Sequence, residues 1–544
     1  MPSDILSPMS RTLLVGFDGA LLSLAEPWVA DGRMPALGSL FEEGAYGLMR
    51  SVYPYNSAVA WTSLATGVDP GRHGIFDFLL PGGGSYALRV ATREDRLVPA
   101  LWNHVAASGG RAGVVNIPMT FPAEPIDGVM VSGMDAPRLE DRAVHPTGEL
   151  ERVRRSGYRI ISGAGEAARK GDWERAEREL VETLVARSTY VQELARPRDL
   201  DLLMVNFEAT DGAHHYFWQH HDPGHSRHDP ALAGRWGDTI ARVYEATDRE
   251  LGRLIEVYEP DTVFVVSDHG GGPTDDWVLF INDWLAAEGF LHLVRGGSST
   301  IARRLYGQVK ERVPEPLRRG LRPWLGKTVD RAKGNALYGD VDWSRSSAYA
   351  QMQAGIRLNL AGREPSGIVA EAGRGRVLAE LSAKAEALVD PTGKRVFSAA
   401  LVAADVYRGD APGGWDLVLE RRPQIHVRSR NTTSRPGSLV RLSDLGMYLP
   451  SGLHTPVGMV AAAGAGIAKS GQVLETDIHD VAPSVLAVMG VGAPDLDGHP
   501  MSFVTKELGS SGASLEEAAG GGTEFTPEEE QAVLERLQAL GYVD

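Results

Sequence analysis

The sequence predicts an α/β protein: an α/β/α sandwich with a largely parallel central sheet and a helical cap insertion. Two observations lead to this fold class. Short apolar runs recur along the chain, as expected for strands that helices cover on both faces. Stretches of helical length and periodicity separate these runs. The chain has 544 residues, of which 43% are apolar and 23% are charged, and this balance is that of a globular protein with ample material for a core.

The apolar runs that we predict as strands of this sheet contain few polar residues. They are Thr12–Phe17, Ala112–Val115, Leu202–Phe207, Thr262–Ser267 and Gly458–Ala462. Between them, Trp173–Ala195 and Arg235–Tyr258 have the length and periodicity of helices. No run approaches the roughly 18 uninterrupted apolar residues of a spanning helix, and the N-terminus lacks the basic region of a signal peptide. We therefore expect a soluble, cytoplasmic protein.

Two regions depart from the alternation of strands and helices. Residues 285–340 contain several prolines and many arginines, and we expect them to form a basic helical cap. Residues 508–525 are rich in Gly, Ser and Ala, which is typical of a flexible linker. The resulting division has five parts: the α/β domain in two segments, 10–284 and 341–507, the cap 285–340, the linker 508–525 and a C-terminal helix in 526–544.

The C-terminal helix has clear start and stop signals. Thr526 is a good N-cap, Pro527 suits the first helical position, and Glu529 completes a capping box. Further along, an apolar stripe of Val533, Leu537 and Leu540 predicts that this helix docks on the body of the protein or on a second subunit, and Gly541 can end it.

Composition excludes several classes of function. The chain has no cysteine, so it has no disulfide, no thiolate metal site and no cysteine nucleophile. A formal net charge of −16 argues against nucleic acid as a general partner. Residues 301–334 are locally basic, with ten Lys and Arg against three acidic residues. That segment can contact an anionic membrane surface weakly or steer an anionic substrate, although a solvated basic helix face explains it as well.

Polar clusters lie beside the predicted strands, where ligands gather in open α/β sheets. Asp18 ends the first strand, Asp211 follows the third with His214 and His215, and Asp268-His269 ends the fourth before Gly270-Gly271-Gly272. His454 lies just before the last strand. Such carboxylates and imidazoles suffice to bind two divalent cations, which can clamp the attacking and leaving oxygens of a phosphoryl transfer. Spacing alone does not choose between His214 and His215.

A hydroxyl-rich segment between Asn56 and Gly67 supplies candidate nucleophiles. A hydroxyl at a helix N-terminus and close to a cation has a lowered pKa and can attack phosphorus. Ser57 is one candidate, and the alternative is that it simply caps the following helix. Composition does not rank it against the other hydroxyls, which are Thr62, Ser63 and Thr66.

These residues resemble the alkaline phosphatase superfamily, in particular its type I phosphodiesterase/nucleotide pyrophosphatase branch and the predicted phosphohydrolase/phosphomutase group within it. The resemblance spans roughly residues 12–500 in order. The matching stretches are Val15–Ala20, Met34–Leu37, Ala60–Gly67, Pro70–Ile75, Asp211 with His215, Ser267–Gly270, Asn359–Pro365, His454–Gly458, Asp480–Ser484 and Asp497-Gly498.

The resemblance implies an alkaline-phosphatase-like sandwich and two divalent metal ions, usually zinc. The resemblance implies that one metal is held by Asp211, His215 and His454. The other metal is held by Asp18, Asp268 and His269 together with the nucleophile oxygen.

In the family that the chain resembles, the nucleophile lies nine residues before the Thr of a Thr-Gly pair. The resemblance therefore implies Ser57, nine residues before Thr66, as the nucleophile, with Thr62 as the runner-up. The sulfatase branch needs Pro and then Arg after its nucleophile, and this chain lacks both. Nucleotide pyrophosphatases hold a phosphoryl oxygen with an Asn where this chain has Phe78.

We therefore expect metal-dependent hydrolysis of a small anionic phosphoester, most simply a phosphodiester, through a phosphoseryl intermediate. The alternatives are a phosphomutase or phosphomonoesterase on the same scaffold, and a non-catalytic metal-binding or membrane-recruited module. The sequence does not specify the oligomeric state.

Overall fold

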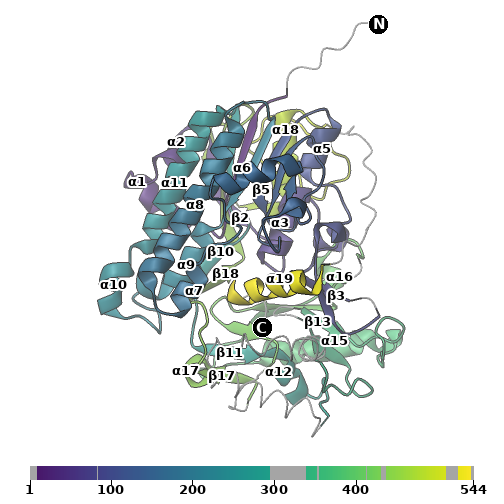
Figure 1. Ribbon diagram of the computed structural model, residues 1–544. Helices are drawn as coiled ribbons and strands as arrows, with labels where there is room; N and C mark the ends of the chain where they lie inside the picture. The colour runs from purple at the N-terminus through teal and green to yellow at the C-terminus, as the bar shows by residue number, and fades with distance from the viewer. Residues whose placement is uncertain are drawn as a thin grey trace, which may run out of the picture.

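The computed structural model describes residues 9–82, 84–294, 338–351, 355–411, 413–430, 437–473, 475–509 and 525–540. The basic segment 301–334 and most of the predicted linker lie outside these residues. The described chain forms an upper lobe around a large sheet and a smaller lower lobe (Figure 1). Among the described residues, no helix is both long enough and apolar enough to cross a membrane.

The large sheet confirms the predicted fold class. Its strand order is β20-β2-β19-β9-β1-β8-β5-β6-β7, with β21 paired to β2. The strands are β1 (Thr12–Phe17), β2 (Ala45–Arg50), β5 (Ala112–Ile117), β6 (Gly128–Ser132), β7 (Val144–His145), β8 (Leu202–Phe207), β9 (Thr262–Val266), β19 (Val457–Gly464), β20 (Gly471–Gln472) and β21 (Thr476–Asp477). The pairs β1·β8, β1·β9, β5·β8 and β5·β6 are parallel, and β19 runs antiparallel to both of its neighbours. All five predicted strands are therefore present.

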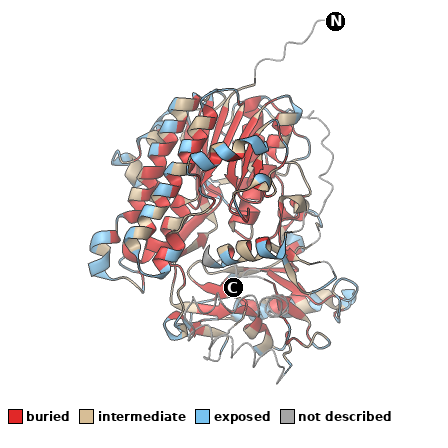
Figure 2. Ribbon diagram, viewed as in Figure 1, coloured by how far each residue is buried: buried red, intermediate tan, exposed pale blue. Residues whose placement is uncertain are grey.

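Two hydrophobic cores cover the two faces of this sheet. Along β1, Leu13, Val15 and Phe17 point into one core and Leu14 points into the other, as the period-two geometry of a strand requires. The first core is closed by α1 (Leu22–Ala30), α2 (Pro35–Glu43), α6 (Leu150–Arg155), α7 (Ala164–Arg169), α8 (Trp173–Ala195), α9 (Ala209–His221) and α11 (Thr239–Tyr258). The second core is closed by α3 (Ser57–Thr66), α5 (Leu101–Ala107) and α18 (Val481–Met489). Figure 2 shows the buried strands between these two helical layers.

One predicted helix boundary is wrong. The segment predicted as a single helix from Arg235 to Tyr258 contains the end of α10 (Pro230–Trp236) and the whole of α11. The break falls at Gly237-Asp238, where Gly237 caps α10 and Asp238 precedes the first turn of α11. Both residue types are poor helix formers, so a short break here costs little.

The smaller lobe has its own hydrophobic core, built from residues between Leu279 and Val427. A four-stranded sheet with the order β12-β13-β15-β14 forms its centre, and a three-stranded sheet with the order β16-β11-β17 lies beside it. The strands are β11 (Trp277–Phe280), β12 (Ala348–Ala350), β13 (Gly355–Leu358), β14 (Phe397–Val402), β15 (Leu417–Arg421), β16 (His426–Arg428) and β17 (Leu439–Arg441). The helices are α12 (Ile281–Ala287), α15 (Arg374–Ala387), α16 (Ala403–Val406) and α17 (Leu442–Leu445).

The C-terminal helix α19 (Pro527–Leu540) docks on the body of the same chain, between the two lobes (Figure 1). Its capping box forms as predicted, because Thr526 N–H donates to Glu529 at 2.7 Å and Glu529 N–H donates to the Thr526 hydroxyl at 3.3 Å. Val533 and Leu537 are fully buried in a cluster that also contains Ala58 and Phe78. The predicted stop at Gly541 lies outside the described residues.

Candidate active site

Asp18 stands at the end of β1, where two donors hold one of its carboxylate oxygens. Trp61 Nε1 donates to Asp18 Oδ2 at 3.1 Å, and Asn206 Nδ2 donates to the same atom at 2.7 Å. Gly16 makes room for this arrangement, since a Cβ there would lie 2.3 Å from the Trp61 ring. The other oxygen, Asp18 Oδ1, accepts no hydrogen bond from the described residues.

Asp268 and His269 follow the neighbouring strand β9. The Gly19 N–H donates to Asp268 Oδ1 at 3.3 Å, while the buried Oδ2 accepts no hydrogen bond within the described chain. His269 Nδ1 donates to the Gly270 carbonyl at 3.0 Å, which leaves Nε2 unprotonated in the neutral ring. This Nε2 lies 3.3 Å from Asp268 Oδ2 and 3.7 Å from Asp18 Oδ1.

The remaining candidates come from α9 and from β18 (Gly452–Thr455). Asp211 and His215 lie four residues apart on α9, and His215 Nε2 is 3.1 Å from Asp211 Oδ2. His215 Nδ1 donates to the Gly452 carbonyl at 2.8 Å, so Nε2 points to the cluster. His454 Nε2 lies 3.4 Å from Asp211 Oδ1 and 3.1 Å from His215 Nε2.

His214 points away from this cluster. Its Nε2 lies 3.0 Å from the Tyr244 hydroxyl, and its ring packs beneath Gly271. Gly271 belongs to β10 (Gly270–Pro273) and pairs with His454 of β18. Tertiary packing thus distinguishes His214 from His215, which their spacing from Asp211 did not. The glycine triplet allows β10 to pack closely against His214 while it pairs with the strand that carries His454.

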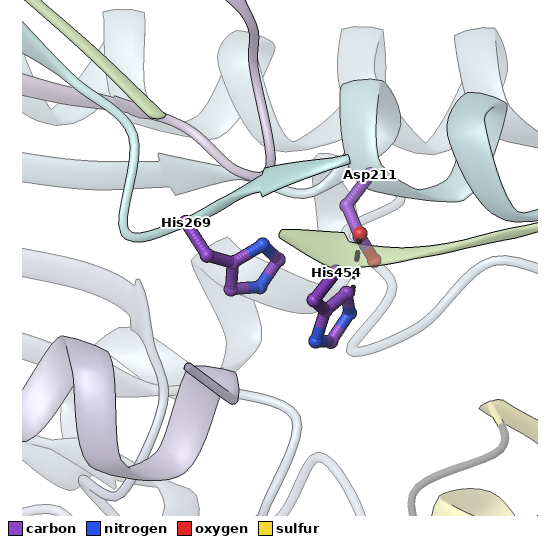
Figure 3. Close-up of side chains that lie close together, drawn as sticks. All are labelled: Asp211, His269 and His454. Atoms are coloured by element: carbon purple, nitrogen blue, oxygen red, sulfur yellow. Dashed lines mark ion pairs between the residues drawn. The ribbon is translucent and has the colours of Figure 1, made fainter. Parts of the chain in front are cut away.

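The six candidate side chains lie around one centre. Among the described residues, two groups of three have ligand atoms within 4.8 Å of one another: Asp211 with His269 and His454, and Asp18 with Asp268 and His269. Figure 3 shows the first group, in which the His269 and His454 rings stack with centroids 3.8 Å apart. His269 therefore reaches both groups, whereas the resemblance assigned it to one metal only.

The electrostatics of this centre fit bound cations. Burial, reinforced by the charges of Asp268 and Asp211, raises the pKa of Asp18 well above its usual value. Burial and the Asp211 charge likewise raise the pKa of Asp268 to about 7. Burial, followed by the neighbouring His269, lowers the pKa of His454 to about 3. Carboxylates that repel one another, the neutral imidazole of His454, and carboxylate oxygens of Asp18 and Asp268 that accept no hydrogen bond from the described residues are what a divalent metal ion would stabilise.

The hydroxyl candidates separate clearly in the structure. Asn56, and not Ser57, is the N-cap of α3, because its side chain accepts from Val59 N–H at 3.1 Å. Ser57 is the first helical residue, and its Oγ lies 3.3 Å from His269 Nε2. Thr62, in contrast, donates to the Ala58 carbonyl at 2.7 Å. The reading of Ser57 as a simple cap is therefore wrong.

The two other hydroxyls are also engaged away from the cluster. Ser63 Oγ lies 2.9 Å from His73 Nε2, and Thr66 donates to the Thr62 carbonyl at 2.7 Å. Phe78, at the place where nucleotide pyrophosphatases have an Asn, is buried in the core that α19 completes. It offers no polar atom to a phosphoryl group.

A cleft between the lobes opens onto the cluster. The upper lobe contributes Tyr53, Tyr55, Asn56, His215 and His454 to its lining, and the smaller lobe contributes Val418, Glu420, Arg421, His426 and Arg428. Sequence reasoning missed the residues from the smaller lobe, since no motif marks them. It also missed Asn206, although a polar residue inside an apolar strand is a signal that could have found it.

Comparisons with known proteins show the family and the fold of this chain. The model of the family "Type I phosphodiesterase / nucleotide pyrophosphatase" matches residues 12–459. Phosphonoacetate hydrolase from Sinorhizobium meliloti 1021, solved with phosphonoformate, is similar at a TM-score of 0.52 and 14% identity over 89% of this chain and 96% of that one. Murine ectonucleotide pyrophosphatase/phosphodiesterase 5, an inactive variant solved with AMP, gives a TM-score of 0.48 and 12% identity over 90% and 97%. No curated protein matches the chain.

The family match covers most of the chain and includes every residue of the cluster, from Asp18 to His454. At 14% identity, the likeness to phosphonoacetate hydrolase shows the fold alone. The chain therefore belongs to the type I phosphodiesterase/nucleotide pyrophosphatase family, and it is a phosphoester hydrolase.

Proposed function

We propose that the protein hydrolyses a phosphodiester at a centre of two divalent metal ions, with Ser57 as the nucleophile. The observation that carries this proposal is the position of Ser57 Oγ, 3.3 Å from the ring nitrogen of His269 that reaches both groups of carboxylates. The other hydroxyls of α3 bond to backbone carbonyls or to His73. Ser57 is thus the hydroxyl of this helix that contacts the cluster within the described chain.

The donor set supports zinc as the metal. Nitrogen and oxygen ligands without thiolates suit zinc sites that keep a position open for substrate. One ion would be held by Asp211, His215 and His454, and the other by Asp18, Asp268 and His269. When bound, two such ions neutralise the charge that develops on the attacking and leaving oxygens of an in-line displacement.

The chain's own residues orient the reaction. Ser57 lies at the N-terminus of α3, where the helix dipole lowers the pKa of a hydroxyl. Its Oγ attacks phosphorus, and the new O–P bond forms as the bond to the departing alcohol breaks. Water then hydrolyses the phosphoseryl group and regenerates Ser57. The cleft lined by Tyr53 and Tyr55 would hold the organic part of the ester.

Two chromogenic esters test this function. We expect bis-p-nitrophenyl phosphate to be hydrolysed faster than p-nitrophenyl phosphate, and we expect a chelator to abolish turnover and added zinc to restore it. Ser57→Ala should lower kcat by at least about 10³-fold, whereas Thr62→Ala should retain most of the activity. Full activity of Ser57→Ala would refute the nucleophile assignment.

The alternative functions give different results in the same assay. A preference for p-nitrophenyl phosphate would indicate a phosphomonoesterase or phosphomutase, which the same cluster can support. If neither ester is turned over while the protein binds two metal ions, hydrolysis of generic esters is refuted. The result then favours a non-catalytic metal-binding module. Trapping and mass spectrometry of phosphorylated Ser57 would distinguish a phosphoseryl intermediate from direct attack by water.

A further inference from the structure

The smaller lobe places a cationic side chain beside the proposed reaction centre. Arg421 is the last residue of β15, and it lines the same cleft as His215 and His454. Its Nη2 donates to the backbone carbonyl of His454 at 3.3 Å. The guanidinium therefore contacts the backbone of a proposed metal ligand, although it comes from a different lobe.

The position of this guanidinium is well fixed. Nη1 donates to the carbonyls of Pro423 at 2.8 Å and Ile425 at 3.4 Å, and the guanidinium carbon lies 5.7 Å from the centre of the Tyr55 ring. A side chain held on two sides by backbone and on a third by an aromatic ring loses little further entropy when it binds a ligand.

Arg421 nevertheless forms no ion pair with a carboxylate of the described residues. No Asp or Glu oxygen of the described chain lies within 4 Å of its nitrogens, and its guanidinium donates to the neutral carbonyls of Pro423, Ile425 and His454. The adjacent carboxylate, Glu420, instead interacts with the Tyr53 hydroxyl and, after burial, raises the pKa of that hydroxyl. Other arginines of the same lobe are paired, as Arg422 is with Asp390 at 2.9 Å and Arg430 with Asp340 at 2.9 Å.

The charge of Arg421 adds to a second one in the cleft. Arg428, at the end of β16, also lines it. His426 lines the same cleft. Its pKa is lowered well below its usual value by burial and then by the charges of Arg227, Arg421 and Arg428, so this ring stays neutral. The side of the cleft that the smaller lobe builds thus carries two guanidinium groups, Arg421 and Arg428, against one carboxylate, Glu420.

We propose that Arg421 forms an anion-binding subsite that takes a second negatively charged group of the substrate, a carboxylate or phosphate beyond the reacting phosphorus. A guanidinium recognises such groups through charge-assisted hydrogen bonds. The reacting phosphoryl group itself faces the carboxylate and histidine cluster. The preferred substrate is therefore a phosphoester whose organic part is anionic. This inference rests on the proposed function, because it assumes that the cleft holds the ester.

A matched pair of symmetric diesters tests the subsite. Diphenyl phosphate and bis(4-carboxyphenyl) phosphate differ in the carboxylates, and their symmetry places a charge on the bound side in either orientation. We expect the wild-type enzyme to prefer the carboxylated ester, and we expect added salt to weaken this preference. Arg421→Met should lower kcat/KM for the carboxylated ester by roughly 10-fold or more and change that for diphenyl phosphate by less than about 3-fold.

Two further variants complete the experiment. Arg421→Lys keeps the charge and should keep part of the preference. Arg376→Met removes an exposed arginine of the same lobe and should leave both esters unaffected. The proposal is overturned if the wild-type enzyme shows no preference, or if Arg421→Met lowers turnover of both esters equally, because Arg421 would then only support the β15–β16 turn. If wild type hydrolyses neither ester nor bis-p-nitrophenyl phosphate, the proposed function itself is wrong.

Discussion

Replacing Gly271 with alanine should weaken metal binding without touching any proposed ligand. A Cβ at this position would lie 2.3 Å from His214 Nδ1, which is 1.1 Å closer than the 3.4 Å at which ordinary contact begins. His214 is fully enclosed and cannot retreat easily, because Tyr244 holds its other nitrogen. The strand β10 must therefore shift away from α9, and it takes with it His454, its direct partner in the β10–β18 register.

The size of the effect follows from this displacement. A shift of about 1 Å in one ligand, at a site where its supporting residues are also disturbed, costs roughly 10- to 100-fold in metal affinity, or about 1.4 to 2.7 kcal/mol. The loss should fall on the site built by Asp211, His215 and His454. Titration calorimetry of zinc into metal-stripped protein measures it directly, as one weakened site and one unchanged site.

Two companion variants separate packing from a general loss of stability. Gly272→Ala alters the next residue of the same strand, where the added Cβ meets only the flexible Thr455 side chain at 3.0 Å, and it should bind zinc like wild type. Combining Gly271→Ala with His214→Ala removes the obstructing ring, so most of the affinity should return. If Gly271→Ala binds two zinc ions with wild-type affinity, the role assigned to this contact is wrong.

Three further perturbations give measurable outcomes. The pKa of Asp268 is raised from 3.8 to about 7 by burial and by the charge of Asp211. Metal-free protein should therefore lose stability as pH rises from about 4 to about 7, by up to about 4 kcal/mol from this group, in urea unfolding. Zinc-loaded protein should lack this slope, and Asp268→Asn should have a smaller slope, because the raised pKa of Asp18 still contributes one of the same sign. Asn206→Ala removes the 2.7 Å hydrogen bond to Asp18 Oδ2 and should lower zinc affinity by roughly 10-fold or more in calorimetry. Leu537→Ala, in the buried stripe of α19, should cost about 2 to 5 kcal/mol of unfolding free energy, and Glu528→Ala on the exposed side should cost almost none.

The convergence of the cluster was predictable because it depends on parallel strands. Asp18 and Asp268 end β1 and β9, and Asp211 follows β8, and these three strands are neighbours in one sheet. The carboxyl ends of neighbouring parallel strands meet at the same edge, so apolar runs followed by Asp were sufficient to bring the three carboxylates together. This reasoning needs only the order of elements along the chain, which the sequence displays.

Choices between adjacent residues were not predictable in the same way. Asn56 and Ser57 are both good N-caps, and only the extended backbone at Asn56, with φ −115° and ψ 155°, makes it the cap and Ser57 the first helical residue. His214 and His215 both lie on the same side of α9 as Asp211. Contacts more than 200 residues away, such as His215 with Gly452, decide which ring joins the cluster. Local spacing carries no information about such partners.

The residues of the cleft wall were the hardest part of the site to predict from the sequence. Arg421 reaches the reaction centre because β15 pairs antiparallel with β13 and β14 in a separate sheet, and because the β15–β16 turn folds back onto the carbonyl of His454. No motif or fixed interval relates residue 421 to residue 454. The two parts of the site thus differ in kind: the cluster follows from the topology of one sheet, whereas the cleft depends on how two lobes meet. Since the same sheet can be combined with many second lobes, the cluster identifies the chemistry, and substrate choice must be read from side chains such as Arg421 that only the folded chain brings into place.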